Sequence, residues 1–214
     1  MREPNNYTIE NNNVTISGEI IGESVFSHDV FGEGFYIIHI STRRMSEEND
    51  LIPVMVSERL LDVKQDLSGK FVTVYGQFRS YNKHESETKN RLVLSVFARE
   101  LELVDEVSEE KDVNSIFLDG YVCKPPIYRK TPLGREIADV LLAVNRPYGK
   151  SDYIPCICWG RNARFAEGFN VGEHVQMWGR IQSRVYNKKI SEDKYEERIA
   201  YEVSVGKLEI LGEE

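Results

Sequence analysis

The chain has 214 residues, of which 41% are hydrophobic and 29% charged, and its formal net charge is −8. This composition is typical of a globular protein that is long enough to bury two modest cores. No apolar run approaches the ~18 residues that span a bilayer, and residues 1–6 lack the apolar segment of a signal peptide, so we expect a cytoplasmic protein that binds no membrane.

The first half of the chain predicts three strands, a short helix and two further strands. The helix is predicted where apolar residues recur at helical spacing before Ser68-Gly69. Alternating apolar and polar residues, many of them β-branched, indicate the strands, and Gly18 inside the first strand indicates a bulge or bend. In chain order, the six elements cover residues 14–21, 34–41, 51–56, 58–67, 69–83 and 91–98.

The second half repeats this pattern. Residues 172–188 match residues 69–83 as a glycine, a charge, alternating apolar residues, an aromatic, a second glycine and a basic Tyr-Asn-Lys tip. Ile52–Val56 returns as Ile154–Cys158 at a shift of 102. Because such landmarks keep their order, two copies of one globular domain fill the chain. We place the domains at residues 1–107 and 112–214, joined by a short acidic linker, and expect them to dock.

The order of these elements predicts the fold class. Three strands, a helix and two strands suit a closed five-stranded barrel in which the helix caps one end. The chain is therefore expected to be all-β, with two tandem five-stranded OB-fold barrels and a short helix between strands 3 and 4 of each. A β-sandwich of ten short strands is the alternative. The helix at the same place in both halves favours the barrels.

The negative net charge hides a basic segment. Residues 1–111 carry 12 basic and 20 acidic residues, whereas residues 112–214 carry 15 of each. Within Tyr121–Lys189 the basic residues outnumber the acidic ones by 12 to 5. Since the local field decides where a polyanion docks, the second half can present a basic working surface.

Several separated motifs of the second half resemble the bacterial single-stranded DNA-binding protein family and its relative, primosomal replication protein N. They are Gly120-Tyr121-Val122, Thr131–Arg135, Val140–Val144, Asp152–Gly160 and Gly172–Tyr186. The resemblance implies base-stacking aromatics at Tyr148, Tyr153, Trp159 and Tyr186, because every base offers a π face to stack on. It also implies phosphate contacts from neighbouring basic residues, namely Arg129, Lys130, Arg146, Arg161, Arg180, Arg184, Lys188 and Lys189. Trp178 suits a core or interface position as well as a ligand contact.

The first copy matches this pattern less well. It has Met45 where the second copy has Tyr148, Leu51 for Tyr153 and Ser57 for Trp159, and only Tyr81 matches an aromatic, Tyr186. We therefore expect weaker DNA binding there, through Arg43, Arg79, Tyr81 and Lys83. Charge reversal of Arg79 and Lys83 should lower the affinity far less than charge reversal of Arg184 and Lys188.

The expected partner is single-stranded DNA, in replication, recombination or repair. RNA stays open, because stacking does not read the 2′-hydroxyl. A protein-interaction adaptor of a replisome or primosome-like complex is the alternative function. Four barrels are usual in the family, so the resemblance implies a homodimer. The sequence ends directly after its last predicted strand, which leads us to expect a phage, mobile-element or accessory relative without the family's protein-recruiting tail.

No cofactor, metal ion or catalysis is expected. Cys123, Cys156 and Cys158 fall in strand-like runs, which favours reduced core thiols over disulfides. Cys156 and Cys158 lack the two-residue spacer of a zinc knuckle, so a zinc site with Cys123 and a histidine is disfavoured. The sequence also lacks a phosphate-binding glycine loop and a nucleophile in a catalytic motif.

Overall fold

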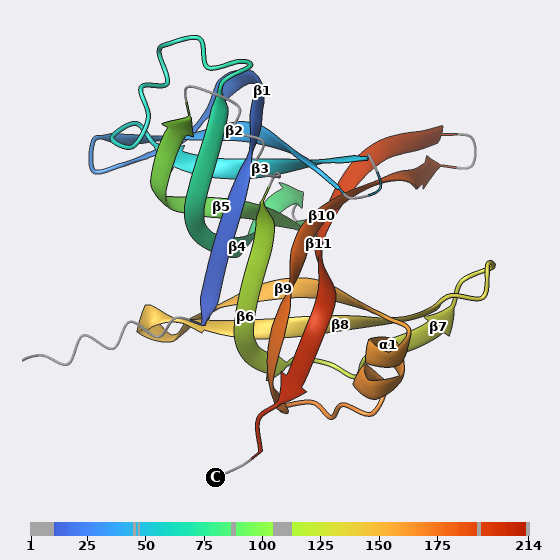
Figure 1. Ribbon diagram of the computed structural model, residues 1–214. Coiled ribbons are helices and arrows are strands. Elements are labelled where there is room, and N and C mark those ends of the chain that lie inside the picture. The colour runs from blue at the N-terminus through green and yellow to red at the C-terminus, as the bar shows by residue number, and fades with distance from the viewer. Residues whose placement is uncertain are drawn as a thin grey trace, which may run out of the picture.

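The computed structural model describes residues 11–44, 46, 48–86, 89–104, 113–191 and 194–212. They form two β-barrels, one above the other in Figure 1. The first barrel consists of β1 (Asn12–Val30), β2 (Glu33–Arg43), β3 (Asn49–Ser57), β4 (Phe71–Ser86) and β5 (Lys89–Val104). The second consists of β6 (Asn114–Val122), β7 (Ile127–Lys130), β8 (Glu136–Arg146), a 3-10 turn (Pro147–Gly149), β9 (Lys150–Trp159), α1 (Arg161–Ala166), β10 (His174–Ser191) and β11 (Lys194–Ile210).

Each barrel closes through one parallel strand pair. In the first barrel, antiparallel pairs join β1 to both β2 and β4, β2 to β3, and β4 to β5, and the parallel pair β3–β5 completes the circle. In the second barrel, β9 and β11 form the parallel pair. Two strands take the place of β1 there: β6 pairs with β10 and β8, and β7 pairs with β8. This is the OB-fold topology, so the predicted fold class is confirmed.

The glycines at equivalent places in β1 and β6 let one strand cross close to another. A Cβ atom on Gly18 would lie 2.1 Å from the carbonyl oxygen of Ser41, and one on Gly120 would lie 2.4 Å from that of Ala143. Only glycine fits such an approach. At Glu19, beside Gly18, β1 changes its partner from β4 to β2, which is the bend that the sequence indicated.

The predicted helix over residues 58–67 is wrong, because this segment forms turns. Leu61 and Leu67 are buried as a helix would require, but two aspartates hold the backbone in turns instead. The Asp62 carboxylate accepts from the backbone N–H of Lys64 (3.2 Å), and that of Asp66 from Ser68 (3.1 Å). Such local bonds compete with helix formation. The second barrel has its helix, α1, and among the described residues no helix is long and apolar enough to cross a membrane.

Two of the three cysteines lie in the core of the second barrel. Cys156 and Cys158 are buried and carry free thiols, and Cys123 is half-buried. Burial raises the pKa of Cys158 to about 12 and that of Cys156 well above its ordinary value. The prediction of reduced core thiols is confirmed for Cys156 and Cys158.

The barrels join through an antiparallel ladder between β1 and β6, side by side in Figure 1. Val14 pairs with Ile116, its own equivalent at the shift of 102. An antiparallel ladder that pairs equivalent residues relates the two barrels by an approximate twofold axis. The two barrels therefore dock, as predicted, and they do so through one continuous sheet. The linker over residues 105–112 lies outside the described residues.

A buried aspartate from each barrel binds the backbone of the other. Asp50 of β3 accepts from the backbone N–H of Ser183 in β10 (2.7 Å), and Asp152 of β9 accepts from that of Ser80 in β4 (2.8 Å). Both carboxylates are 1% exposed. Since buried polar groups need partners, these two clamps fix how each long hairpin lies on the opposite barrel.

Candidate nucleic-acid interface

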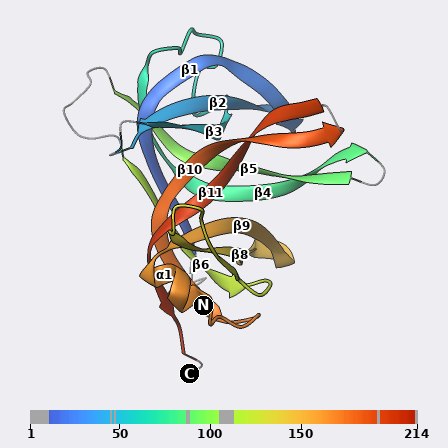
Figure 2. The ribbon, with the colours of Figure 1, turned by 90° about the vertical axis from the view of Figure 1, so that its right-hand side faces the viewer.

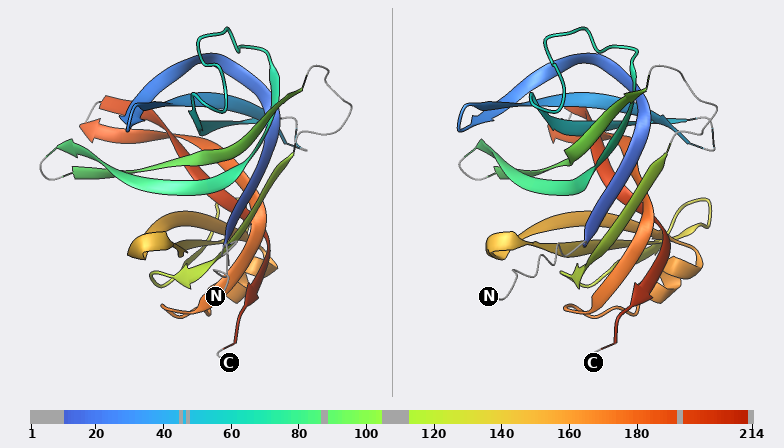
Figure 3. Two further views of the ribbon diagram at one scale, coloured as in Figure 1. Left: turned by 90° about the vertical axis from the view of Figure 1, so that its left-hand side faces the viewer. Right: turned by 60° about the vertical axis from the view of Figure 1, so that its left-hand side comes forward.

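The β4–β5 and β10–β11 hairpins project from the same side of the molecule (Figures 2 and 3). Between them lies a groove of about 540 Å³, which we call the inter-hairpin groove. It is lined by Tyr81, Lys83, Arg91, Leu92, Val93, Leu94, Pro155, Tyr186, Lys188, Arg198, Ile199, Ala200 and Tyr201. Both barrels thus contribute to one concave surface.

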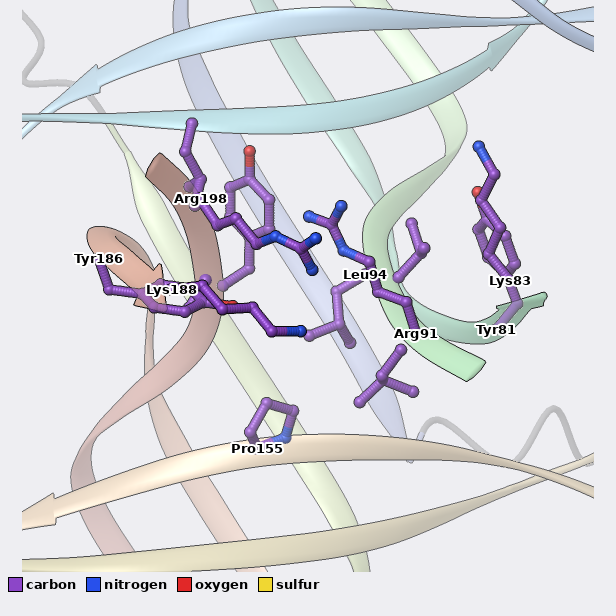
Figure 4. Close-up of a pocket in the computed structure, with 13 residues that line it drawn as sticks. Tyr81, Lys83, Arg91, Leu94, Pro155, Tyr186, Lys188 and Arg198 are labelled. Atoms are coloured by element: carbon purple, nitrogen blue, oxygen red, sulfur yellow. The ribbon is translucent and has the colours of Figure 1, made fainter. Parts of the chain in front are cut away.

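Cations and tyrosines give this groove its chemistry. Lys188 and Arg198 reach into it from β10 and β11, and Arg91 reaches in from β5 (Figure 4). Burial raises the pKa of the Tyr201 phenol, and the Arg91 guanidinium of the other barrel partly offsets this rise. None of the described residues that line the groove is acidic. The groove can therefore attract a phosphate backbone and offer rings to bases.

Tyr186 and Tyr81 both line the groove, but they lie at different distances from the bulge of their hairpin. Each hairpin has a bulge just before a glycine, Gly76 in β4 and Gly179 in β10. Counted from these glycines, Tyr81 matches Arg184, and Tyr186 matches Lys83. The hairpin of the second barrel is two residues longer on each strand, since it closes at Ser191 rather than at the position matching Ser86. Counted from the hairpin turns instead, Tyr81 and Tyr186 do match, because each lies five residues before the serine that closes its hairpin. The predicted equivalence therefore holds at the hairpin tips and not relative to the bulges.

The outer face of β9 extends the groove along the second barrel. Side chains alternate across a strand, so Tyr153 and Trp159 lie on the same face as Pro155, which lines the groove. Tyr153 is 45% exposed and Trp159 38%, and the Trp159 indole N–H donates to Ser204 (3.2 Å). Tyr148 is 99% exposed on the 3-10 turn before β9, with a left-handed backbone (φ 64°). All four predicted aromatics are accessible.

Carboxylates contact several of the predicted cations. Arg129 pairs with Asp139 (2.7 Å), Arg146 with Asp152 (3.3 Å), and Arg184 lies 3.8 Å from Glu202. The Arg184 guanidinium also lies 5.9 Å from the centre of the Tyr186 ring. The predicted cations are therefore less available, as a set, than their number suggests.

Arg180 has a structural partner. Its guanidinium donates to the buried Asp50 carboxylate of the first barrel (2.8 Å), beside Arg44, which donates to the same carboxylate (2.8 Å). It lies in the inter-barrel clamp rather than in the inter-hairpin groove.

The remaining predicted residues are dispersed. Lys130, Arg161 and Lys189 are exposed at the end of β7, the start of α1 and the tip of β10. Arg43 is exposed at the end of β2, and Arg79 is half-buried on β4. Met45 lies outside the described residues. Trp178 packs against Phe117 on the outside of the β6–β10 sheet, with ring centres 5.1 Å apart, and does not line the groove.

Sequence reasoning missed Arg198 and Tyr201. Arg198 faces Tyr186 across the β10–β11 ladder. The sequence could have indicated this position only if the hairpin turn had been placed correctly, because the register then puts Arg198 opposite Tyr186. The acidic residues around Arg198 make the strand look unlike a basic, DNA-binding one.

The sequence pattern of the Single-strand binding protein family matches residues 113–210. Single-stranded DNA-binding protein B of Bacillus subtilis is 34% identical over 83 residues, which are 36% of this chain and 74% of the relative. Single-stranded DNA-binding protein 2 of Listeria innocua is 36% identical over 81 residues, which are 35% of this chain and 51% of the relative. The chain spans about half the length of most of the curated relatives it matches.

A solved structure extends the likeness to both barrels. The wild-type single-stranded DNA-binding protein from Thermus aquaticus has a TM-score of 0.72 at 17% identity, covering 95% of this chain and 94% of that one. The fold is therefore shared along 95% of this chain, and the match to the family pattern lies in the second barrel. Fold, motifs and relatives together show that the chain belongs to the Single-strand binding protein family.

Proposed function

We propose that the chain binds single-stranded DNA without sequence preference, as a non-enzymatic protein of replication, recombination or repair in the cytoplasm. The observation that carries the proposal is the inter-hairpin groove, where tyrosines and cations of both barrels meet without a lining carboxylate. Its DNA-binding relatives support the choice of ligand.

The bound strand would combine two interactions. Bases stack on the exposed rings of Tyr153 and Trp159 and on the half-buried ring of Tyr186, and each stack contributes about 1–3 kcal/mol. Phosphates approach Lys83, Arg91 and Lys188 in the groove and release counterions, whereas Arg198 is 10% exposed and pairs with Glu196 (2.8 Å). Neither interaction reads a base edge, so sequence preference should be small.

Fluorescence titration with oligo-dT tests this function. The Trp178→Phe variant keeps Trp159 as the only tryptophan, next to the proposed stacking face. We expect saturable quenching, with log K falling by about 0.7 per phosphate neutralised as log salt rises. For Lys83, Arg91 and Lys188 of the groove, the total slope should be about −2. Absent quenching at low salt, or equal affinity for duplex DNA, would contradict the proposal and favour a protein-interaction adaptor.

We also propose that two chains associate to give four barrels. The outer face of the joined sheet carries two ring pairs, Phe117 with Trp178 and Tyr121 with His174, whose centres are 5.1 and 4.6 Å apart and of which Tyr121 is exposed and the others half-buried. A second copy related by a twofold axis could cover both pairs. Light scattering should give a mass of twice 24.7 kDa, and a mass of a single chain at micromolar concentration would refute this assembly.

A further inference from the structure

A side chain of the first barrel holds the backbone of Tyr153, one of the proposed stacking residues of the second barrel. The backbone N–H of Tyr153 in β9 donates to the hydroxyl oxygen of Ser80 in β4 (2.7 Å). Within the described residues, the parallel ladder between β9 and β11 starts only at Cys156, so β11 does not reach this N–H. A part-buried backbone N–H needs an acceptor, and here the acceptor comes from the other barrel.

Ser80 is itself fixed by the residue next to Tyr153. It is 8% exposed, and its own backbone N–H donates to the carboxylate of Asp152 (2.8 Å). Two hydrogen bonds, one in each direction, therefore join Ser80 to two successive residues of β9. The Asp152 side chain is buried in the barrel interface, whereas the Tyr153 side chain, on the opposite face of β9, stays exposed. The two bonds set the position of the Tyr153 backbone and, with it, the direction in which the ring points.

The approximate twofold axis repeats this bonding on the other side of the interface, around a leucine. Counted from the bulge glycines, Ser183 of β10 is the equivalent of Ser80. The backbone N–H of Leu51 donates to the Ser183 hydroxyl (3.2 Å), and that of Ser183 donates to Asp50 (2.7 Å). Leu51 stands where the second barrel has Tyr153. The two sides thus share one bonding pattern, but only the side built on Ser80 carries a ring.

The side with the ring is held by fewer ionic contacts. The Asp50 carboxylate accepts from two guanidiniums, those of Arg44 and Arg180, each through a contact of 2.8 Å. Among the described residues, the Asp152 carboxylate accepts from one guanidinium, that of Arg146, at the longer distance of 3.3 Å. The side with the ring therefore depends more on its serine.

We infer that Ser80 is a positioning residue for DNA binding by the other barrel, because its hydroxyl holds the Tyr153 ring where a base can stack on it. A binding group contributes fully only when neighbouring bonds keep it within about 0.5 Å of its productive place. Without the Ser80 hydroxyl, the Tyr153 N–H loses its acceptor and the ring can shift away from the base. The first barrel thus contributes to binding by placing a ring of the second. This inference rests on the proposed function, since it requires Tyr153 to stack.

The test compares the oligo-dT affinities of Ser80→Ala and Ser183→Ala, both in the Trp178→Phe chain, where quenching of Trp159 reports binding. Each variant removes one serine hydroxyl that accepts from a backbone N–H of the other barrel. We expect Ser80→Ala to lower the affinity about five- to tenfold, which is part of the contribution of one stacked base, and Ser183→Ala to change it by less than about twofold. The urea midpoints should fall alike, because both variants lose one such bond. A loss of affinity in Ser80→Ala alone is then not a loss of stability.

Ser80→Ala is also combined with Tyr153→Leu, which gives the second barrel the residue that the first barrel carries at this position. With no ring left to position, Ser80→Ala should lower the affinity by less than about twofold further, so the two losses are not additive. A direct contact between Ser80 and DNA would instead give additive losses. Additive losses, equal losses in the two serine variants, or full affinity in Tyr153→Leu would overturn the inference and leave DNA binding by the groove standing. If even the unaltered chain gave no saturable quenching, the proposed function itself would fail.

Discussion

Replacing Asp50 with alanine will lower the free energy of unfolding by about 3 kcal/mol, because it leaves Arg44, Arg180 and the backbone N–H of Ser183 without their acceptor. The loss lies at the low end for a buried ion pair, since the Arg44 and Arg180 side chains stay 19% and 37% exposed. The Asp50 carboxylate accepts from Arg44, from Arg180 and from the backbone N–H of Ser183, the last two across the barrel interface. Urea denaturation measures the loss. Both tryptophans lie in the second barrel, so fluorescence reports that barrel and circular dichroism reports both. In the variant, the unfolding transition followed by fluorescence should separate from the one followed by circular dichroism.

Asp139→Ala is the control for this change. Asp139 also pairs with an arginine, Arg129, but both side chains are substantially exposed, at 38% and 52%. Pairs of this kind contribute at most about 1 kcal/mol. Equal losses in the two variants would show that Asp50 is not the clamp that the geometry indicates.

The fold could be predicted from the sequence because apolar and polar residues alternate along each core strand, and because both barrels repeat the same order of strands. The helix predicted over residues 58–67 is absent, although apolar residues recur there at helical spacing, because turns also bury Leu61 and Leu67. Asp62 and Asp66 favour turns over a helix through hydrogen bonds to the nearby backbone. The spacing of apolar residues does not reveal such bonds.

The sequence predicted the chemistry of the candidate site, which is aromatic and basic. It did not predict which of these residues come together. The sequence predicted rings at Tyr148, Tyr153 and Trp159, which are exposed, and at Tyr186, which is half-buried, since aromatic residues in polar surroundings near loops stand out. The partners of the cations were not predicted, because Asp50 and Arg180 lie in different barrels and 130 positions apart. A repeated Tyr-Asn-Lys triplet also concealed a hairpin extension of two residues on each strand, which keeps the same face and so leaves the alternation intact.

Charge reversal of Lys83 in the first barrel will weaken oligo-dT binding about as much as charge reversal of Lys188 in the second, each on the order of tenfold at low salt. The sequence predicts a far smaller effect for the first barrel, because that barrel keeps only one of the four aromatic positions and residues 1–111 carry 12 basic and 20 acidic residues. The structure changes that prediction, because Lys83 and Lys188 line the same groove. Each substitution should also make the salt slope shallower by about 0.7.

Lys70→Glu is the matched control. It makes the same change in net charge at an exposed position of the first barrel that does not line the inter-hairpin groove. If net charge alone governed the affinity, Lys70→Glu would weaken binding as much as Lys83→Glu. If the second barrel acted alone, Lys83→Glu would behave like the control and only Lys188→Glu would lose affinity. Equal losses at Lys83 and Lys188, with little change at Lys70, require a strand that contacts both barrels at once, because a contact confined to one barrel cannot depend equally on a cation of each.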